Sequence, residues 1–483
     1  MNTLSFIGKG LRFRPQRTLF LLLGFAVGVM VMTVLLSVGT AVLDQAKDAD
    51  LTGGGDIVLL PVGIDVSVLK TGGVTSMNFD IPNARFLTRE LLAKRRLPGV
   101  ATVSPELSRV YATLLHGGHE QMVRIEGVVP SRFRALWPAM TAALVDGPAE
   151  RDYVDPEFTA LLYEIDAFHP PVVDTSQVWA EWHYFNYHDD SGRSLYVSVS
   201  AVAFDQDLSA SGYSRGVVLF EMVDPDGRQT KIVDTLPGRE IAASYDSPDL
   251  VAGLNAVRLD GGVYAVSLSL ADSLSRPVTV TLELTPTPHQ YVPPVTPLGS
   301  DTPFGYVVPV LRGRMTGRVT MGGHTIQLDG TGYHDHNWGH FKNAVWDWGI
   351  VHAGPYSVLY GRFAASADEL QQRPVLFAVY DGDGARPFVL TGDYRVDWRP
   401  GNQPAGVTLH FANGENSLTL VIAVERRFVS ETGGGEQPLF RADESARSFF
   451  YQMEGKARLT GRLDGRAVDE TGHAYSETFF VDR

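Results

Sequence analysis

The feature that most constrains the fold of this chain is a period-two alternation of apolar and polar residues in its larger, C-terminal part. Apolar Leu, Val and Ala alternate with hydroxyl, Tyr or Glu side chains in residues 195–202 and 278–284. Residues 217–223 and 263–270 are also strand-like, and turn sequences such as Asp-Pro-Asp-Gly at 224–227 separate the segments. Because successive side chains of a strand point to opposite faces, we predict a mainly β fold with antiparallel sandwich or barrel units.

A second group of predicted strands begins near residue 346. Residues 285–309 contain seven prolines, and we predict an extended surface connection there because proline cannot donate to a strand ladder. Residues 430–437 include three consecutive glycines and are expected to form a flexible loop. The predicted strands of the second group are residues 357–363, 375–380, 407–411, 418–424, 456–459 and 475–480.

Residues 19–43 contain no charged side chain. As a helix rising about 1.5 Å per residue, this run is long enough to cross the roughly 30 Å hydrocarbon core of a membrane. Four basic residues and no acidic residue precede it. The positive-inside rule then predicts a cytoplasmic segment over residues 1–17, a transmembrane helix over residues 18–43, and an extracytoplasmic body of a single-pass cell-membrane protein. A cleavable signal peptide is the alternative, although its apolar core is usually only ~7–15 residues long.

The net charge and the lack of cysteine exclude several classes of function. The chain has 483 residues and a formal net charge of −14. Its first 17 residues are basic, so the remaining body is more acidic still, which argues against a nucleic-acid partner. Hydrophobic residues make up 44% of the chain, enough for packed cores, and the length predicts about three domains. Without cysteine, disulfides, cysteine-ligated zinc and cysteine nucleophiles are excluded.

Residues 44–150 have the pattern of a small extracytoplasmic α/β region. Strands are predicted at residues 56–61 and 122–128, and an amphipathic helix at residues 84–96 ends at a Leu-Pro-Gly-Val sequence. This order, after a membrane helix, resembles the start of an FtsX-like or MacB-like ABC-transporter permease. No later window is apolar enough for another membrane helix. The resemblance therefore implies an anchor or a docking module for ABC-transporter components, not a transport channel.

Residues 330–339 are dense in polar and aromatic side chains, with the sequence Gly-Thr-Gly-Tyr-His-Asp-His-Asn-Trp-Gly. In a strand, His334 and His336 share one face, and Asp335 and Asn337 share the other. Titratable groups among large aromatic rings are typical of a site in an apolar pocket. The alternative is a polar turn held by structural hydrogen bonds.

The His-x-His pair of this motif could bind zinc or copper, with His340 or His352 as a third nitrogen ligand. The alternative is a pair of hydrogen-bonded imidazoles that fix the backbone. Because no further carboxylate or histidine lies at a clear ligand spacing, we predict neither a metal ion nor a cofactor.

Motifs in three parts of the chain resemble those of the hydroxyneurosporene synthase (carotenoid 1,2-hydratase) family, within the wider lipocalin-like AttH group. The central one is Tyr-His-Asp-His-Asn-Trp-Gly at 333–339. Upstream, Glu-Trp-His-Tyr-Phe-Asn at 181–186 is similar to the group's Glu-Trp-Trp-Tyr-Phe-Asn, with His183 replacing the second Trp. The downstream matches are Trp-Asp-Trp at 346–348, Leu-Tyr-Gly-Arg at 359–362 and Gly-His-Ala-Tyr-Ser-Glu-Thr at 472–478.

The resemblance covers residues 151–483 and implies two lipocalin-like antiparallel β domains, over residues 151–345 and 346–483. It also implies acid–base chemistry on an apolar terpenoid or lipid alkene. Protonating an isolated alkene needs an acid that stays protonated in an apolar pocket. It also needs aromatic rings that face the resulting carbocation.

In the hydratases, the His and Trp of the His-Asn-Trp step are important, here His336 and Trp338, together with a Tyr-x-Asp whose Asp is the proposed proton donor. The best match begins at Tyr360 and reads Tyr-Gly-Arg. Arginine cannot usefully donate a proton near neutral pH, so Asp335 or Asp347 would have to serve as the acid.

We therefore predict two sets of site residues. The predicted catalytic residues are Asp335, His336, Trp338, Asp347 and Tyr360. The predicted substrate-binding residues are Tyr333, His334, Trp346, Trp348, Trp182, Tyr184 and Glu181. If the motifs at 181–186 and 333–339 meet across a pocket, His183 becomes a further candidate alongside Glu181, although strand alternation favours the opposite face for His183.

The sequence thus predicts a membrane-anchored enzyme of the carotenoid-hydratase type, a hydratase or cyclase acting on an apolar small molecule. Neither a Walker-type phosphate loop nor a Gly-x-Ser-x-Gly elbow is present. The alternative is a non-enzymatic protein that binds an apolar ligand and associates with an ABC transporter. The permease-like anchor and the missing Tyr-x-Asp motivate that alternative.

Overall fold

The contacts of the chain divide it into two compact units, Met1–Ala84 with Lys94–Tyr153, and Arg85–Ala93 with Val154–Arg483. In the first unit, β1 (Glu106–His116) and β2 (His119–Val128) form an antiparallel hairpin, and the strand predicted at 122–128 lies within β2. The computed structural model describes residues 84, 87, 88, 91, 103–116, 119–128, 158–172, 178–204, 208–288, 290–295, 304–340, 345–364, 367–372, 375–382, 388–400, 403–413, 416–432 and 447–482.

The predicted membrane helix of residues 18–43 and the predicted strand at 56–61 lie outside these residues. Within the part of the chain that the structure describes, no helix has both the length and the apolar character needed to cross a membrane.

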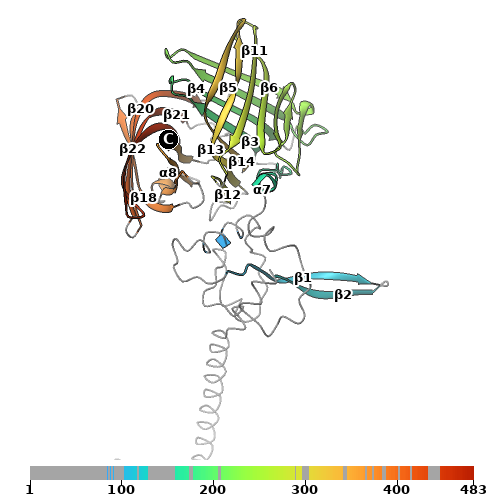
Figure 1. Ribbon diagram of the computed structural model, residues 1–483. Coiled ribbons are helices and arrows are strands. Elements are labelled where there is room, and N and C mark those ends of the chain that lie inside the picture. The colour runs from blue at the N-terminus through green and yellow to red at the C-terminus, as the bar shows by residue number, and fades with distance from the viewer. Residues whose placement is uncertain are drawn as a thin grey trace, which may run out of the picture. The chain divides into compact units, whose positions relative to one another are not determined.

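The second unit is mainly β, as predicted, and begins with a 12-stranded antiparallel sheet (Figure 1). Its strand order is β6-β5-β4-β3-β14-β13-β11-β10-β9-β8-β7, and β12 pairs with β13 off this path. The strands are β3 (Trp179–His188), β4 (Ser194–Ala203), β5 (Arg215–Val223), β6 (Gln229–Pro237), β7 (Ile241–Ala243), β8 (Leu250–Ala252), β9 (Asn255–Asp260), β10 (Val263–Ala271), β11 (Pro277–Pro286), β12 (Val292–Val295), β13 (Phe304–Met321) and β14 (His324–His340).

This sheet curls around its own core. The edge strands β6 and β7 are consecutive in the chain and are joined by a single 3-10 turn, η2 (Gly238–Glu240). The inner face packs one cluster of buried apolar side chains. Helix α7 (Phe158–Ile165) adds Leu161, Leu162 and Ile165, which share one face of the helix, to that cluster. The residue after α7 is thereby placed inside the sheet.

The remaining strands form a closed eight-stranded barrel in which β15 pairs with both β16 and β22. Its interior is filled by side chains, including the stacked rings of Phe377 and Phe411, whose centroids lie 3.5 Å apart. The strands predicted for this half are confirmed, and α8 (Ala367–Gln372) lies between β16 and β17. The barrel strands are β15 (Val345–Ala353), β16 (Tyr356–Ala364), β17 (Val375–Tyr380), β18 (Phe388–Arg399), β19 (Gln403–Asn413), β20 (Asn416–Thr432), β21 (Arg447–Leu463) and β22 (Arg466–Asp482).

An aromatic layer joins the sheet to the barrel. Side chains of β3, β13 and β14 form one cluster with side chains of β15, β16, β17 and β22. Hydrogen bonds cross the same boundary: the Tyr475 hydroxyl donates to the Tyr187 carbonyl at 2.7 Å, and the Ser194 hydroxyl donates to Glu454 at 2.9 Å. The sheet and the barrel therefore pack as one unit.

The prediction of a surface connection over residues 285–309 was wrong in part. Strand β11 continues to Pro286, β12 occupies Val292–Val295, and β13 starts at Phe304. Prolines fit here because β12 pairs only with β13, and the β13–β14 register is irregular between Val307 and Val310, around a proline.

Candidate functional site

The two motifs singled out in the sequence lie side by side. Strand β3, with the motif at 181–186, pairs antiparallel with β14, with the motif at 333–339, and His183 is opposite His336 in the register. Alternation sends His183 and His336 to the inner face of the sheet and Asp335 to the aromatic layer facing the barrel. The side chains of the two motifs therefore lie in two separate environments, one on each face of the sheet.

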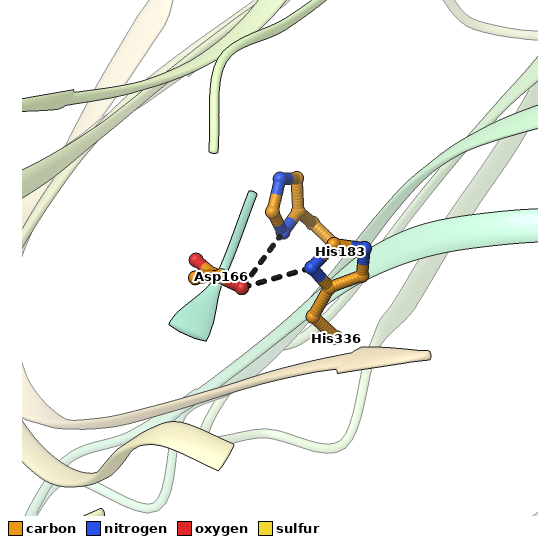
Figure 2. Close-up of side chains that lie close together, drawn as sticks. All are labelled: Asp166, His183 and His336. Carbon is orange, nitrogen blue, oxygen red and sulfur yellow. Dashed lines mark hydrogen bonds and ion pairs between the residues drawn. The ribbon is translucent and has the colours of Figure 1, made fainter. Parts of the chain in front are cut away.

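On the inner face, Asp166 lies at the centre of a buried polar cluster (Figure 2). This residue directly follows α7. Its Oδ1 atom is 2.9 Å from His336 Nδ1 and 4.0 Å from His183 Nδ1. Its Oδ2 atom is 3.1 Å from His334 Nε2 and accepts a 2.7 Å hydrogen bond from the Tyr264 hydroxyl. Asp166 and the three histidines have no exposed surface.

The electrostatics of this cluster favour a charged carboxylate. Burial alone would raise the pKa of Asp166, but the attraction of His334 and hydrogen bonds from His334 and His336 hold that pKa well below its usual value. Burial would lower the pKa of His336, but hydrogen bonds to Asp166 and Glu181 raise it to about 9. Burial holds the pKa of His183 well below its usual value.

Glu181 extends the cluster toward the rim of the sheet. Its Oε1 atom is 3.0 Å from His336 Nε2 and 2.8 Å from His169 Nδ1, and the His169 backbone N–H also donates to it at 2.9 Å. The His169 ring stacks on Trp338 with centroids 4.1 Å apart. Gly305 leaves room for Trp338, since a Cβ atom there would lie 2.1 Å from the indole ring.

On the outer face, a chain of hydrogen bonds ends at Asp335. Trp348 Nε1 donates to the Tyr306 hydroxyl at 2.9 Å, and the Tyr306 and Tyr333 hydroxyls are 2.8 Å apart. The Tyr333 hydroxyl donates to Asp335 Oδ2 at 2.7 Å, and Asn337 donates to Oδ1 at 2.9 Å. Because the indole can only donate, the chain runs in one direction and makes Asp335 its final acceptor.

Beside this chain, a pocket opens between the sheet and the barrel. Its cavity volume is about 20 Å³, room for roughly one water molecule, and the unfilled space around it reaches about 370 Å³ only when the part open to solvent is included. Its walls combine aromatic and apolar side chains with three carboxyl groups. Residues from β3, β4 and β5 line one side, and residues from β20, β21 and β22 line the other. The lining residues include Tyr184, Tyr196, Glu221, Gln452, Glu454 and Glu477.

Glu477 is the carboxyl group of this pocket whose acidity suits proton transfer at neutral pH. Burial raises its pKa from 4.5 to about 7, against two long hydrogen bonds, from Trp346 Nε1 at 3.3 Å and from Gln452 at 3.4 Å. Burial also raises the pKa of Asp335 well above its usual value, and the nearby charge of Glu477 adds to that effect. Burial likewise raises the pKa of the Tyr184 phenol, which keeps it neutral.

The remaining predicted site residues have other surroundings. Asp347 accepts a 2.7 Å hydrogen bond from Arg362 Nε and a 2.6 Å bond from Thr478. Tyr360 is buried in the core of the barrel. Trp182 packs against the aromatic layer. His340 and His352, the possible third metal ligands, instead lie against the backbone carbonyls of Val172 and Leu311.

Asp166, Tyr306 and Glu477 are among the site residues that the sequence analysis did not single out. Asp166 had no signal, because it belongs to none of the motifs and reaches the histidines only because α7 packs inside the sheet. Tyr306 lies within residues 285–309, which were predicted to form a surface connection. Glu477 belongs to the motif at 472–478. Its place in the alternating pattern of β22 was the only sequence signal that its side chain points to one particular face of that strand.

Comparisons with known proteins give structural similarity only. No protein-family model and no curated protein matches the sequence. The crystal structure of a putative AttH (NE1406) from Nitrosomonas europaea shows 13% identity over 65% of this chain and 96% of that one, with a TM-score of 0.43. The crystal structure of CghA shows 14% identity over 64% of this chain and 89% of that one, with a TM-score of 0.41. The crystal structure of kievitone hydratase from Nectria haematococca shows 12% identity over 62% of this chain and 88% of that one, with a TM-score of 0.40.

These three similarities are to the fold, at low identity. None of the three concerns an FtsX-like or MacB-like permease, and none assigns this chain to a family.

Proposed function

We propose that this protein binds a small apolar, unsaturated molecule in the pocket between the sheet and the barrel and protonates it from Glu477. One observation supports this above all: a carboxyl group whose pKa is raised to about 7 lines a pocket with aromatic walls. An acid with a pKa near the working pH is both protonated in a large fraction of molecules and strong enough to donate.

The chemistry follows from the surroundings of Glu477. The Glu477 O–H bond breaks and the π electrons of a substrate C=C bond take the proton, which leaves a carbocation on the other alkene carbon. Water then adds to that carbon, and the proton it loses restores the Glu477 carboxyl, so the net reaction is hydration. If a second C=C bond attacks in place of water, a new C–C bond forms and the charge moves to the second alkene; loss of a proton from the adjacent carbon to the Glu477 carboxylate then gives a cyclised product and restores the acid.

Aromatic rings beside the acid suit a cationic intermediate. Tyr184 and Tyr196 both line the pocket and lie with their ring centroids 5.0 Å apart. The faces of such rings attract a cation, by about 2 kcal/mol or more where water is excluded. Burial raises the pKa of both phenols, so they stay neutral and do not quench the acid.

The two aspartates predicted as acids have less suitable surroundings. The hydrogen bonds that Asp335 accepts, at 2.7 and 2.9 Å, are shorter than those to Glu477, and its side chain is not among those lining the pocket. Asp347 is held by Arg362 and Thr478. We therefore assign proton donation to Glu477 and give Asp335 the role of fixing the Tyr333 hydroxyl and the aromatic layer.

The test is incubation of the full-length protein with an isoprenoid and lipid extract in heavy water, followed by mass spectrometry. We expect a product carrying a solvent-derived deuterium on carbon. Glu477→Gln should reduce its formation by about 10²–10⁴-fold, while Glu283→Gln, a change at an exposed position of β11, should not.

Two outcomes would count against this function. Equal product formation by Glu477→Gln and the wild type would remove the acid from the proposal. Retention of one apolar compound, chemically unchanged, by the wild-type protein would favour the non-enzymatic binding protein instead.

We also propose that residues 19–43 anchor the protein in the cell membrane with its body outside the cytoplasm, on the basis of the uncharged apolar run and the basic segment before it. The full chain should then stay with the membrane after an alkaline carbonate wash and be cleaved by protease added to spheroplasts. Release by the wash, or protection from the protease, would contradict this topology.

A further inference from the structure

The cluster around Asp166 contains donor atoms at metal-ligand spacing. Asp166 Oδ1, His183 Nδ1 and His336 Nδ1 all lie within 4.8 Å of one another. The carboxylate oxygen is 2.9 Å from one nitrogen and 4.0 Å from the other. Ligands at about 2.1 Å from a tetrahedral ion are about 3.4 Å apart, so these separations lie on either side of the required value.

Hydrogen bonding fixes which nitrogen of His183 carries the proton. Its Nε2 atom lies 2.8 Å from the Pro248 carbonyl, which can only accept, so Nε2 carries hydrogen. In the neutral ring, Nδ1 is then a bare lone pair. It is buried without a hydrogen-bond partner among the described residues, and Figure 2 shows it directed at Asp166. A lone pair facing a carboxylate is stabilised by a positive charge between them, either a proton on the ring or a bound metal ion.

His334 repeats the same arrangement on the other carboxylate oxygen. Its Nδ1 atom is 3.0 Å from the Tyr184 carbonyl and must donate to it. In the neutral ring, Nε2 therefore presents a lone pair to Asp166 Oδ2 at 3.1 Å. Two neutral imidazoles would thus direct lone pairs at one buried carboxylate.

We propose that Asp166, His183 and His336 bind a divalent transition-metal ion of the zinc type, with His334 Nε2 as the fourth donor. Mixed imidazole and carboxylate ligands are typical of such ions. The ion also suits the local charge, because a divalent cation balances the two nearby carboxylates, those of Asp166 and Glu181.

The groups behind the ligands have the arrangement usual in metal sites, where the second ring nitrogen of each histidine is held by a carboxylate or a carbonyl. Glu181 holds His336 Nε2 at 3.0 Å, and the Pro248 carbonyl holds that of His183. The Tyr264 hydroxyl orients the carboxylate of Asp166. A second grouping, of His169, Glu181 and His336, is weaker because its facing atoms are already paired with one another.

This ion would be structural. Its ligands have no exposed surface, and they join the residue after α7 to β3 and β14. It lies on the opposite face of these strands from Asp335 and does not depend on the proposed reaction. An ion that binds the folded chain and not the unfolded chain stabilises the folded state by mass action.

The test is metal binding by the full-length protein after chelator treatment, using Zn²⁺ as the probe, with metal analysis after dialysis and thermal unfolding in parallel. We expect about one ion per chain and a higher unfolding midpoint with Zn²⁺. His183→Gln should weaken binding about a hundredfold or more. His352→Gln, which changes a buried histidine on β15 that contacts the Leu311 carbonyl and no atom of this cluster, should bind as the wild type does.

Folded wild-type protein that neither retains Zn²⁺ nor gains thermal stability from it would overturn the proposal, whether or not the variants fold. Equal binding by His183→Gln and the wild type would also overturn it, because the ion would then be held elsewhere on the chain.

Discussion

Replacing Glu477 by glutamine tests the electrostatics of the pocket through protein stability, independently of any substrate. Burial raises the pKa of this carboxyl from 4.5 to about 7. Each pKa unit corresponds to about 1.4 kcal/mol, so ionised Glu477 costs the folded state about 3 kcal/mol at most. Glutamine keeps an oxygen that can accept from Trp346 and Gln452 but cannot ionise.

The pH dependence has a definite sign. Below pH 4.5 the carboxyl is protonated in both the folded and the unfolded chain, and stability does not depend on it. As the pH rises above 4.5, the unfolded chain loses this proton first and binds fewer protons than the folded chain, so stability falls until the folded carboxyl ionises near pH 7. The variant lacks this decrease.

The assay is urea unfolding of the wild type, Glu477→Gln and the control Glu283→Gln at a series of pH values. Relative to the wild type, Glu477→Gln should gain about 3 kcal/mol between pH 4.5 and slightly alkaline pH. The control should follow the wild type throughout. Parallel curves for Glu477→Gln and the wild type would refute a carboxyl kept protonated by burial, and with it the basis of the proposed proton donor.

Two further perturbations test the packing around the sites. Burial lowers the pKa of His473 from 6.5 to about 4, so the folded chain binds fewer protons than the unfolded chain at low pH. Acid should therefore destabilise the wild type by up to about 3 kcal/mol. In urea unfolding, His473→Gln should lack this acid-dependent loss of stability, whereas the exposed control His324→Gln should keep it. Gly305→Ala should lower stability by about 1–3 kcal/mol because its Cβ atom meets Trp338, whereas Gly361→Ala, with its nearest neighbour at 3.6 Å, should lie within about 1 kcal/mol in the same assay.

The strands could be predicted from the sequence because alternation is a local property. Segments such as 195–202 and 278–284 lie within β4 and β11 as expected. The same rule correctly separated His334 and His336 from Asp335 on β14. The consequence of alternation for the site was not drawn from the sequence. The predicted catalytic set included both Asp335 and His336, although the two side chains lie on opposite faces of β14.

The contacts between distant segments could not be predicted in the same way. Asp166 reaches the histidines because α7 buries Leu161, Leu162 and Ile165 inside the curled sheet, and nothing in the local sequence states that. Glu477 acquires its raised pKa from burial between the sheet and the barrel, a boundary formed by segments far apart in the chain.

The pairing of β3 with β14 links the two proposed sites mechanically. A strand that slips by one residue exchanges its faces, so His336 cannot stay with Asp166 unless Asp335 stays opposite Tyr184 of β3, on the face toward the barrel. An ion bound on the inner face would therefore hold the register that positions Asp335 and the aromatic layer beside the pocket. Loss of the ion should then loosen the pocket without changing any residue that lines it, and the two proposals remain separable because only one of them requires Glu477.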